Sequence, residues 1–97
     1  MKILWTEPAR MDLREIFLYI SNDSPKAARV LLNTIKNRVE LLTENPRLGR
    51  IGRVEGTYEL VLAGTRYIVP YRINNQQIEI LAVFHGSREW PDNFQTQ

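Results

Sequence analysis

The sequence predicts an α+β domain in which an N-terminal strand and an antiparallel two-helix hairpin pack on a mainly antiparallel sheet. Apolar residues recur at helical spacing through the first half of the chain, whereas residues 58–84 alternate along extended segments. Breaks at 21–25 and at 45–46 separate these patterns. The resulting element order is β-α-α-β-β-β.

The first elements are a short strand over residues 2–6 and a helix over residues 7–20. Thr6 can cap this helix, and Pro8 fits its first turn, where a backbone N–H has no helical acceptor. The apolar stripe consists of Ala9, Leu13, Ile16, Phe17 and Ile20. Four charged residues lie off the stripe and are predicted to face solvent: Arg10, Asp12, Arg14 and Glu15.

A second helix is predicted from Pro25, with Ser24 as its cap, to about Glu44. Its apolar face consists of Ala28, Leu31, Leu32, Ile35, Val39 and Leu42. The sequence Asn45-Pro46 stops it, because proline disfavours helical angles in the residue before it. The short link between the helices indicates an antiparallel hairpin lying across the sheet.

Residues 46–57 have no clear period and are predicted to form a loop rich in glycine and arginine. Three strands follow, at 58–62, 66–73 and 78–84, with a turn at 74–77. The last strand is apolar on both faces and should therefore lie inside the sheet.

The preferred register of the last hairpin pairs Arg72 with Glu79 and, by continuation, Arg66 with His85. A shift by two residues keeps the same faces but loses the Arg72–Glu79 match. One sheet face is then expected to bury apolar residues while the other displays Arg66, Arg72 and His85.

Composition indicates a single domain over residues 1–97, with a flexible tail at 91–97. An apolar share of 43% and a charged share of 25% are typical of a globular domain, and no apolar run is long enough to span a membrane. With no cysteine and one histidine, no metal site and no cofactor are expected, and the protein is expected to be cytoplasmic. The net charge of +2 is small, but ten of the thirteen basic residues are arginine, which suits phosphate or carboxylate recognition.

Residues 85–91, HGSREWP, bring the histidine, an arginine and a tryptophan together as the chain leaves the sheet. The candidate target- or nucleic-acid-binding residues are Arg47, Arg50, Arg53, Arg66, Arg88 and Trp90. The alternative for the arginines is ion pairing or solvation, and for Trp90 it is packing against the core. His85 is a candidate general acid or base, with a capping or packing role as the alternative.

The segments NPRLGRIGRVEG, YEL, GTRYIVPYRI and IEILAVFHGSREWP, in this order, resemble the RelE/ParE family of toxins from type II toxin–antitoxin modules. The resemblance extends from about Lys2 to Pro91. It implies a compact toxin that a cognate antitoxin holds inactive by winding around the helix hairpin and sheet. We expect that antitoxin to be acidic where it meets Arg47–Arg53.

The family divides by target. RelE-like members cut mRNA on the ribosome, whereas ParE-like members poison DNA gyrase. This sequence has no lysine after Lys36 and no tyrosine after Tyr71, which departs from the ribonuclease pattern. The ParE-like branch is therefore favoured, and the protein is not expected to be an enzyme.

Two alternatives remain beside a gyrase inhibitor. In a metal-independent, ribosome-dependent endoribonuclease, the catalytic residues would be Arg66, His85 and Arg88. In a degenerate relative, the chain would only bind its antitoxin.

Overall fold

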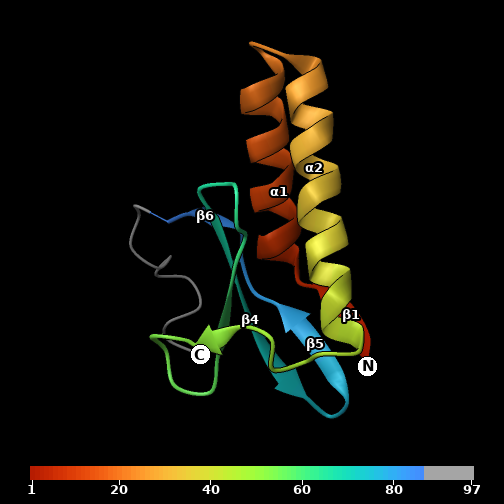
Figure 1. Ribbon diagram of the computed structural model, residues 1–97, viewed down its shortest axis with the longest axis vertical. Coiled ribbons are helices and arrows are strands. Elements are labelled where there is room, and N and C mark those ends of the chain that lie inside the picture. The colour runs from red at the N-terminus through yellow and green to blue at the C-terminus, as the bar shows by residue number, and fades with distance from the viewer. Residues whose placement is uncertain (87–97) are drawn as a thin grey trace.

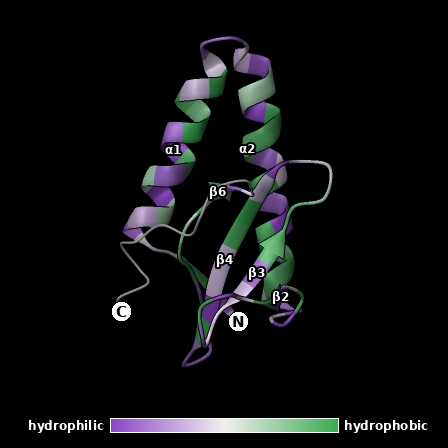
Figure 2. Ribbon diagram, turned by 90° about the vertical axis from the view of Figure 1, so that its left-hand side faces the viewer, coloured by the Kyte–Doolittle hydropathy of each residue, from purple (hydrophilic) through white to green (hydrophobic). Residues whose placement is uncertain are grey.

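A helical hairpin and a mixed sheet form two layers in the computed structural model, which describes residues 1–86 (Figure 1). The elements are β1 Lys2–Trp5, α1 Glu7–Ser21, α2 Pro25–Glu40, the 3₁₀ turn η1 Leu41–Thr43, β2 Arg50–Ile51, β3 Tyr58–Val61, β4 Tyr67–Asn74, β5 Gln77–Ile80 and β6 Phe84–His85. The strand order is β1-β5-β4-β3-β2, and β6 pairs with β4. Figure 2 shows that the hairpin reaches well beyond the sheet, so helix-on-helix packing supports its far end.

Both helices begin where their capping residues predict. The Thr6 hydroxyl accepts a hydrogen bond from the Ala9 N–H (3.4 Å), and the Ser24 hydroxyl accepts one from the Ala27 N–H (3.1 Å). These bonds satisfy helix donors that would otherwise have no partner. The predicted second helix corresponds to α2 together with η1.

The core lies between the helices and the sheet. Its buried members include Ala9, Ile35, Val39, Leu42, Leu60, Leu62, Val69, Tyr71, Ile78 and Ile80. The helical members all belong to the two predicted stripes. Their positions confirm that apolar spacing identified the faces that pack on the sheet.

The sheet is mixed because β1 runs parallel to β5, with Lys2 opposite Gln77 and Trp5 opposite Ile80. All other strand pairs are antiparallel. β5 lies between β1 and β4, which confirms that the strand beginning near residue 78 is internal.

The predicted hairpin register is confirmed over β4 and β5. Arg72 lies opposite Glu79, and the Arg72 Nε donates to a Glu79 carboxylate oxygen at 2.5 Å. Asn75 and Gln76 form the turn with φ of 49° and 62°. Two successive positive φ values match the twist of a tight hairpin, and asparagine tolerates this conformation well.

The predicted continuous strand 78–84 is wrong. The chain leaves the ladder after Ile80 and returns at Phe84, one residue later than the β4–β5 register requires. In the interruption, the Val83 N–H donates to the Asp12 carboxylate of α1 at 3.0 Å. The Val83 N–H, which would otherwise be available to the β-ladder, is therefore bonded to a helix side chain. The strand bulges at this point.

This bulge also makes the predicted pairing of Arg66 with His85 wrong. His85 lies opposite Tyr67, and the Gly86 N–H donates to the Arg66 carbonyl. Because side chains alternate along a strand, His85 shares the face of Tyr67, whereas Arg66 belongs to the opposite face.

The loop over residues 46–57 includes the two-residue strand β2, which the sequence did not predict. The buried Tyr71 hydroxyl donates to the Pro46 carbonyl at 2.7 Å and accepts from the Gly49 N–H at 2.9 Å. A Cβ at Gly49 would lie 2.9 Å from this hydroxyl, so the close approach requires glycine.

Candidate functional site

The buried carboxylate of Glu59 pairs with two arginines of the loop. Its side chain is 2% exposed and pairs with Arg50 at 2.8 Å and with Arg53 at 3.2 Å. The Arg53 backbone N–H also donates to it, at 3.2 Å. The Arg47 Nε donates to the Tyr58 hydroxyl at 3.2 Å. Two of the three predicted loop arginines are therefore paired with Glu59, a residue that the sequence did not indicate as their partner.

The sheet arginines do not form a single patch with His85. Arg72 pairs with Glu79. Arg66 is exposed, and no carboxylate within residues 1–86 pairs with it. Arg88 and Trp90, predicted to complete the site, lie outside the described residues.

His85 lies in a cleft of about 800 Å³ between α1 and the end of the sheet. We call it the acidic cleft; it is lined by Asp12, Glu15, Ile16, Tyr19, Tyr67, Val83, Phe84 and His85. The rings of Tyr67 and His85 meet edge to face, with centroids 5.7 Å apart. Within residues 1–86, the charged residues that line this cleft together with His85 are thus the carboxylates Asp12 and Glu15 of α1.

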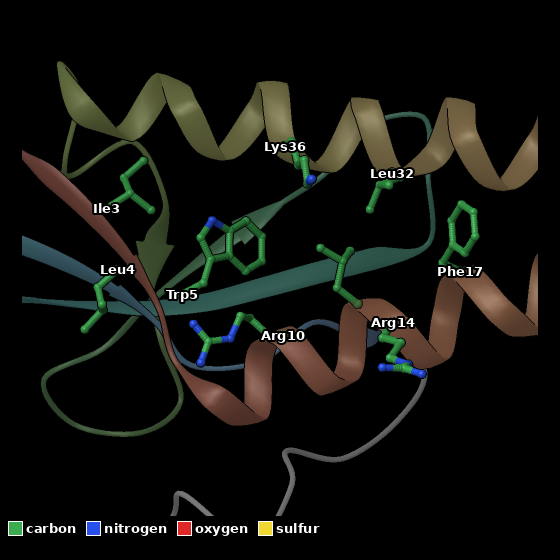
Figure 3. A pocket seen from close by; sticks show the side chains of 9 residues that line it. Ile3, Leu4, Trp5, Arg10, Arg14, Phe17, Leu32 and Lys36 are labelled. Atoms are coloured by element: carbon green, nitrogen blue, oxygen red, sulfur yellow. The ribbon is translucent and has the colours of Figure 1, made fainter.

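A second cleft, of about 680 Å³, lies on the other side of α1 (Figure 3). We call it the basic cleft; it is lined by Ile3, Leu4, Trp5, Arg10, Leu13, Arg14, Phe17, Leu32 and Lys36. Figure 3 shows Trp5 between the two helices, Lys36 extending from α2, and Arg10 and Arg14 on α1. The Arg10 side chain also pairs with Glu7 at 2.8 Å.

Neither cleft was predicted from the sequence. Arg10, Asp12, Arg14 and Glu15 were assigned to a solvated helix face, but they divide between the two clefts by charge. The available signal was the i, i+4 spacing of Arg10 and Arg14, which places both on one side of the helix. That spacing does not reveal what the neighbouring strand contributes.

Within residues 1–86, no group of histidine and acidic residues is arranged to hold a metal ion. In the same part of the chain, no helix is both long and apolar enough to cross a membrane.

Comparison with known proteins decides the family. A model described as the ParE toxin of the type II toxin–antitoxin system, parDE, matches residues 3–90. The chain belongs to this ParE toxin family. Y4kP of Sinorhizobium fredii is 46% identical to it over 90 residues, which cover 93% of each chain.

Solved structures agree with this assignment. A chain of the chromosomal ParDE system from P. aeruginosa superposes with a TM-score of 0.78 and 28% identity, covering 88% of this toxin and 95% of that chain. A chain of the RelBE2 complex from Mycobacterium tuberculosis superposes with a TM-score of 0.60 and 27% identity, covering 87% of this chain and 95% of that chain. A chain of the E. coli RelBE complex superposes with a TM-score of 0.68 at 14% identity, covering 90% of this chain and 98% of that chain. This likeness shows that the two chains share a fold. The predicted resemblance to RelE/ParE toxins and the predicted fold class are confirmed.

Proposed function

We propose that this ParE-family toxin inhibits growth by binding DNA gyrase and that a cognate antitoxin neutralises it. Family membership supports the toxin role. The choice of a protein-binding mechanism over RNA cleavage depends on one observation: within residues 1–86, the other charged residues that line the cleft of His85 are Asp12 and Glu15, and Arg66 is not among them.

That arrangement is poorly suited to ribonuclease chemistry. Cleavage without a metal needs a general base beside groups that neutralise a phosphate. Two carboxylates that line the same cleft as the imidazole would repel a phosphate bound there instead. Within residues 1–86, Arg50 and Arg53 are paired with Glu59, Arg72 is paired with Glu79, and Arg66 does not line the cleft that holds His85.

The basic cleft is the surface that best fits the antitoxin. Its apolar residues offer a floor for the apolar side of an amphipathic segment, while Arg10, Arg14 and Lys36 attract acidic residues on the other side. The structural neighbours are solved as toxin–antitoxin complexes, which supports such a partner. The acidic contact with Arg47–Arg53 stays a prediction, although Glu59 already occupies two of these arginines.

The test is a gyrase supercoiling assay with the purified toxin, alone and after addition of its antitoxin. We expect the toxin to inhibit supercoiling and the antitoxin to restore it. Unimpaired supercoiling at a molar excess of folded toxin would contradict the proposal. Message cleavage by the same preparation in a translating extract would instead identify a ribonuclease.

A further inference from the structure

The outward side of α2 carries a second line of side chains, separate from the stripe that packs on the sheet. We call it the α2 seam; its residues are Ala27, Val30, Thr34, Arg38 and Leu41. They follow one another at intervals of three or four, which places them on one side of the helix. Val30 is 58% exposed and Leu41 is 52% exposed, although both are large and apolar. Such a line of uncovered side chains is typical of a helix that packs against another helix.

The two polar members of the α2 seam use their polar groups within the chain. The Thr34 hydroxyl donates to the Val30 carbonyl at 2.9 Å, and the Arg38 guanidinium donates to the Ala63 carbonyl at 3.2 Å. The methyl group of Thr34 and the aliphatic stem of Arg38 are therefore left for apolar packing. A groove of about 570 Å³ runs beside the seam, between α2 and the turn that joins β3 to β4.

The charges on the flank of the α2 seam change sign along the helix. Lys26 and Arg29 lie near its start and Glu40 lies at its end, with the neutral Asn33 and Asn37 between them, and all five are exposed. A uniformly acidic partner would be repelled by Glu40. An antiparallel helix of the same sequence would instead place its own Glu40 near Lys26 and its own Lys26 near Glu40. The flank of the seam is therefore complementary to itself in reverse orientation.

We propose that the α2 seam binds a second copy of this chain, with the two α2 helices antiparallel about a two-fold axis at Thr34. In this register Ala27 of one copy lies opposite Leu41 of the other, so a small side chain meets a large one. Val30 lies opposite the stem of Arg38. A two-fold contact uses the same surface on both copies. The seam is separate from the basic cleft, and its pairing does not depend on gyrase being the target.

Sedimentation velocity of the full chain without antitoxin, from micromolar to millimolar concentration, measures the self-association. We expect the chain to shift from monomer to dimer over this range. A chain that stays monomeric at every concentration would overturn the proposal. In that case, protection of the α2 seam from hydrogen exchange on addition of antitoxin would identify the antitoxin as its occupant.

Charge reversals test the antiparallel orientation. Lys26→Glu alone and Glu40→Lys alone should each weaken the dimer about tenfold, because each places like charges together at two symmetry-related positions. The double variant Lys26→Glu and Glu40→Lys should restore the wild-type equilibrium, since opposite charges meet again. A double variant that is folded by circular dichroism but does not recover the dimer would overturn the proposal.

Lys36→Glu is the matched control, because Lys36 belongs to the same helix but lines the basic cleft. This variant should leave the dimer unchanged while it weakens antitoxin binding. The two readouts therefore distinguish a failure of the seam proposal from a failure of the antitoxin proposal. Equal losses of dimer in Lys36→Glu and Lys26→Glu would mean that overall charge controls the association, which would overturn the proposal.

Discussion

The arginines of the β2–β3 region and the cations of the basic cleft are chemically alike, but they stand in different surroundings. Arg50 and Arg53 flank the buried carboxylate of Glu59. Arg14 and Lys36 border an apolar floor instead. The first group pairs with an acid of the toxin's own fold, whereas the second lines the cleft that we propose as the antitoxin site. Surface charge alone therefore does not identify a binding site, because an acid of the same chain can already occupy a surface arginine, as Glu59 does for Arg50 and Arg53.

The largest effect is expected from Glu59→Ala. Removing the acid leaves two guanidinium groups and the Arg53 N–H without their shared acceptor, and it opens a gap in a buried position. We expect the free energy of unfolding to fall by about 3 kcal/mol, measured by urea denaturation. The control, Glu55→Ala at an exposed loop position, should change it by less than about 0.5 kcal/mol. A small loss at Glu59 would show that these arginines are available to ligands.

A smaller loss is expected from Tyr71→Phe. The substitution removes the hydroxyl that joins Pro46 and Gly49, at a cost of about 2 kcal/mol in the free energy of unfolding at neutral pH. The result would show how far this hydroxyl holds the arginine loop in place.

The same variant predicts a pH dependence. Burial raises the pKa of Tyr71 above its ordinary value of 10.0, against the opposing effect of the Gly49 hydrogen bond. A raised folded-state pKa contributes stability that is complete below pH 10 and is lost as the pH rises through the folded value. The difference in the free energy of unfolding between wild type and Tyr71→Phe, measured by urea denaturation, should therefore become smaller in alkaline solution. A gap that widens there would contradict this account.

Antitoxin binding provides the third comparison. The double variant Arg14→Glu and Lys36→Glu should weaken antitoxin affinity about tenfold, through repulsion at the rim of the basic cleft. Arg66→Glu, a single charge reversal at an exposed residue outside the basic cleft, serves as the control and should have little effect. Calorimetry at low and high salt would measure both. A larger loss of antitoxin affinity in Arg66→Glu would indicate that the antitoxin binds the sheet and not the basic cleft.

The smallest effect is expected for Arg72 and Glu79. Their ion pair is partly exposed, with 40% of the arginine side chain accessible. A double-mutant cycle with Arg72→Gln and Glu79→Gln should give a coupling energy of about 0.5 kcal/mol. A coupling energy as large as the loss of stability in Glu59→Ala would contradict the expectation that an exposed ion pair contributes less than a buried one.

Much of the fold was predictable because its determinants are local. Thr6 and Ser24 act on their own helices, and the turn at Asn75 fixes the register of the strands beside it. The site was less predictable. The bulge before Phe84 depends on Asp12, which is distant in the chain, and it moves His85 to the other face of the sheet. The apolar spacing within either segment gives no sign of the contact between Asp12 and Val83.

The parallel pairing of β1 with β5 has a consequence for synthesis. Within the described residues, the first strand to leave the ribosome has a single neighbouring strand, and that neighbour is among the last to be translated. A nascent chain therefore cannot pair β1 with its neighbour until β5 has been translated. In the proposed toxin–antitoxin pair, this late completion of the sheet leaves an interval in which an antitoxin that is already present can meet the unfinished toxin.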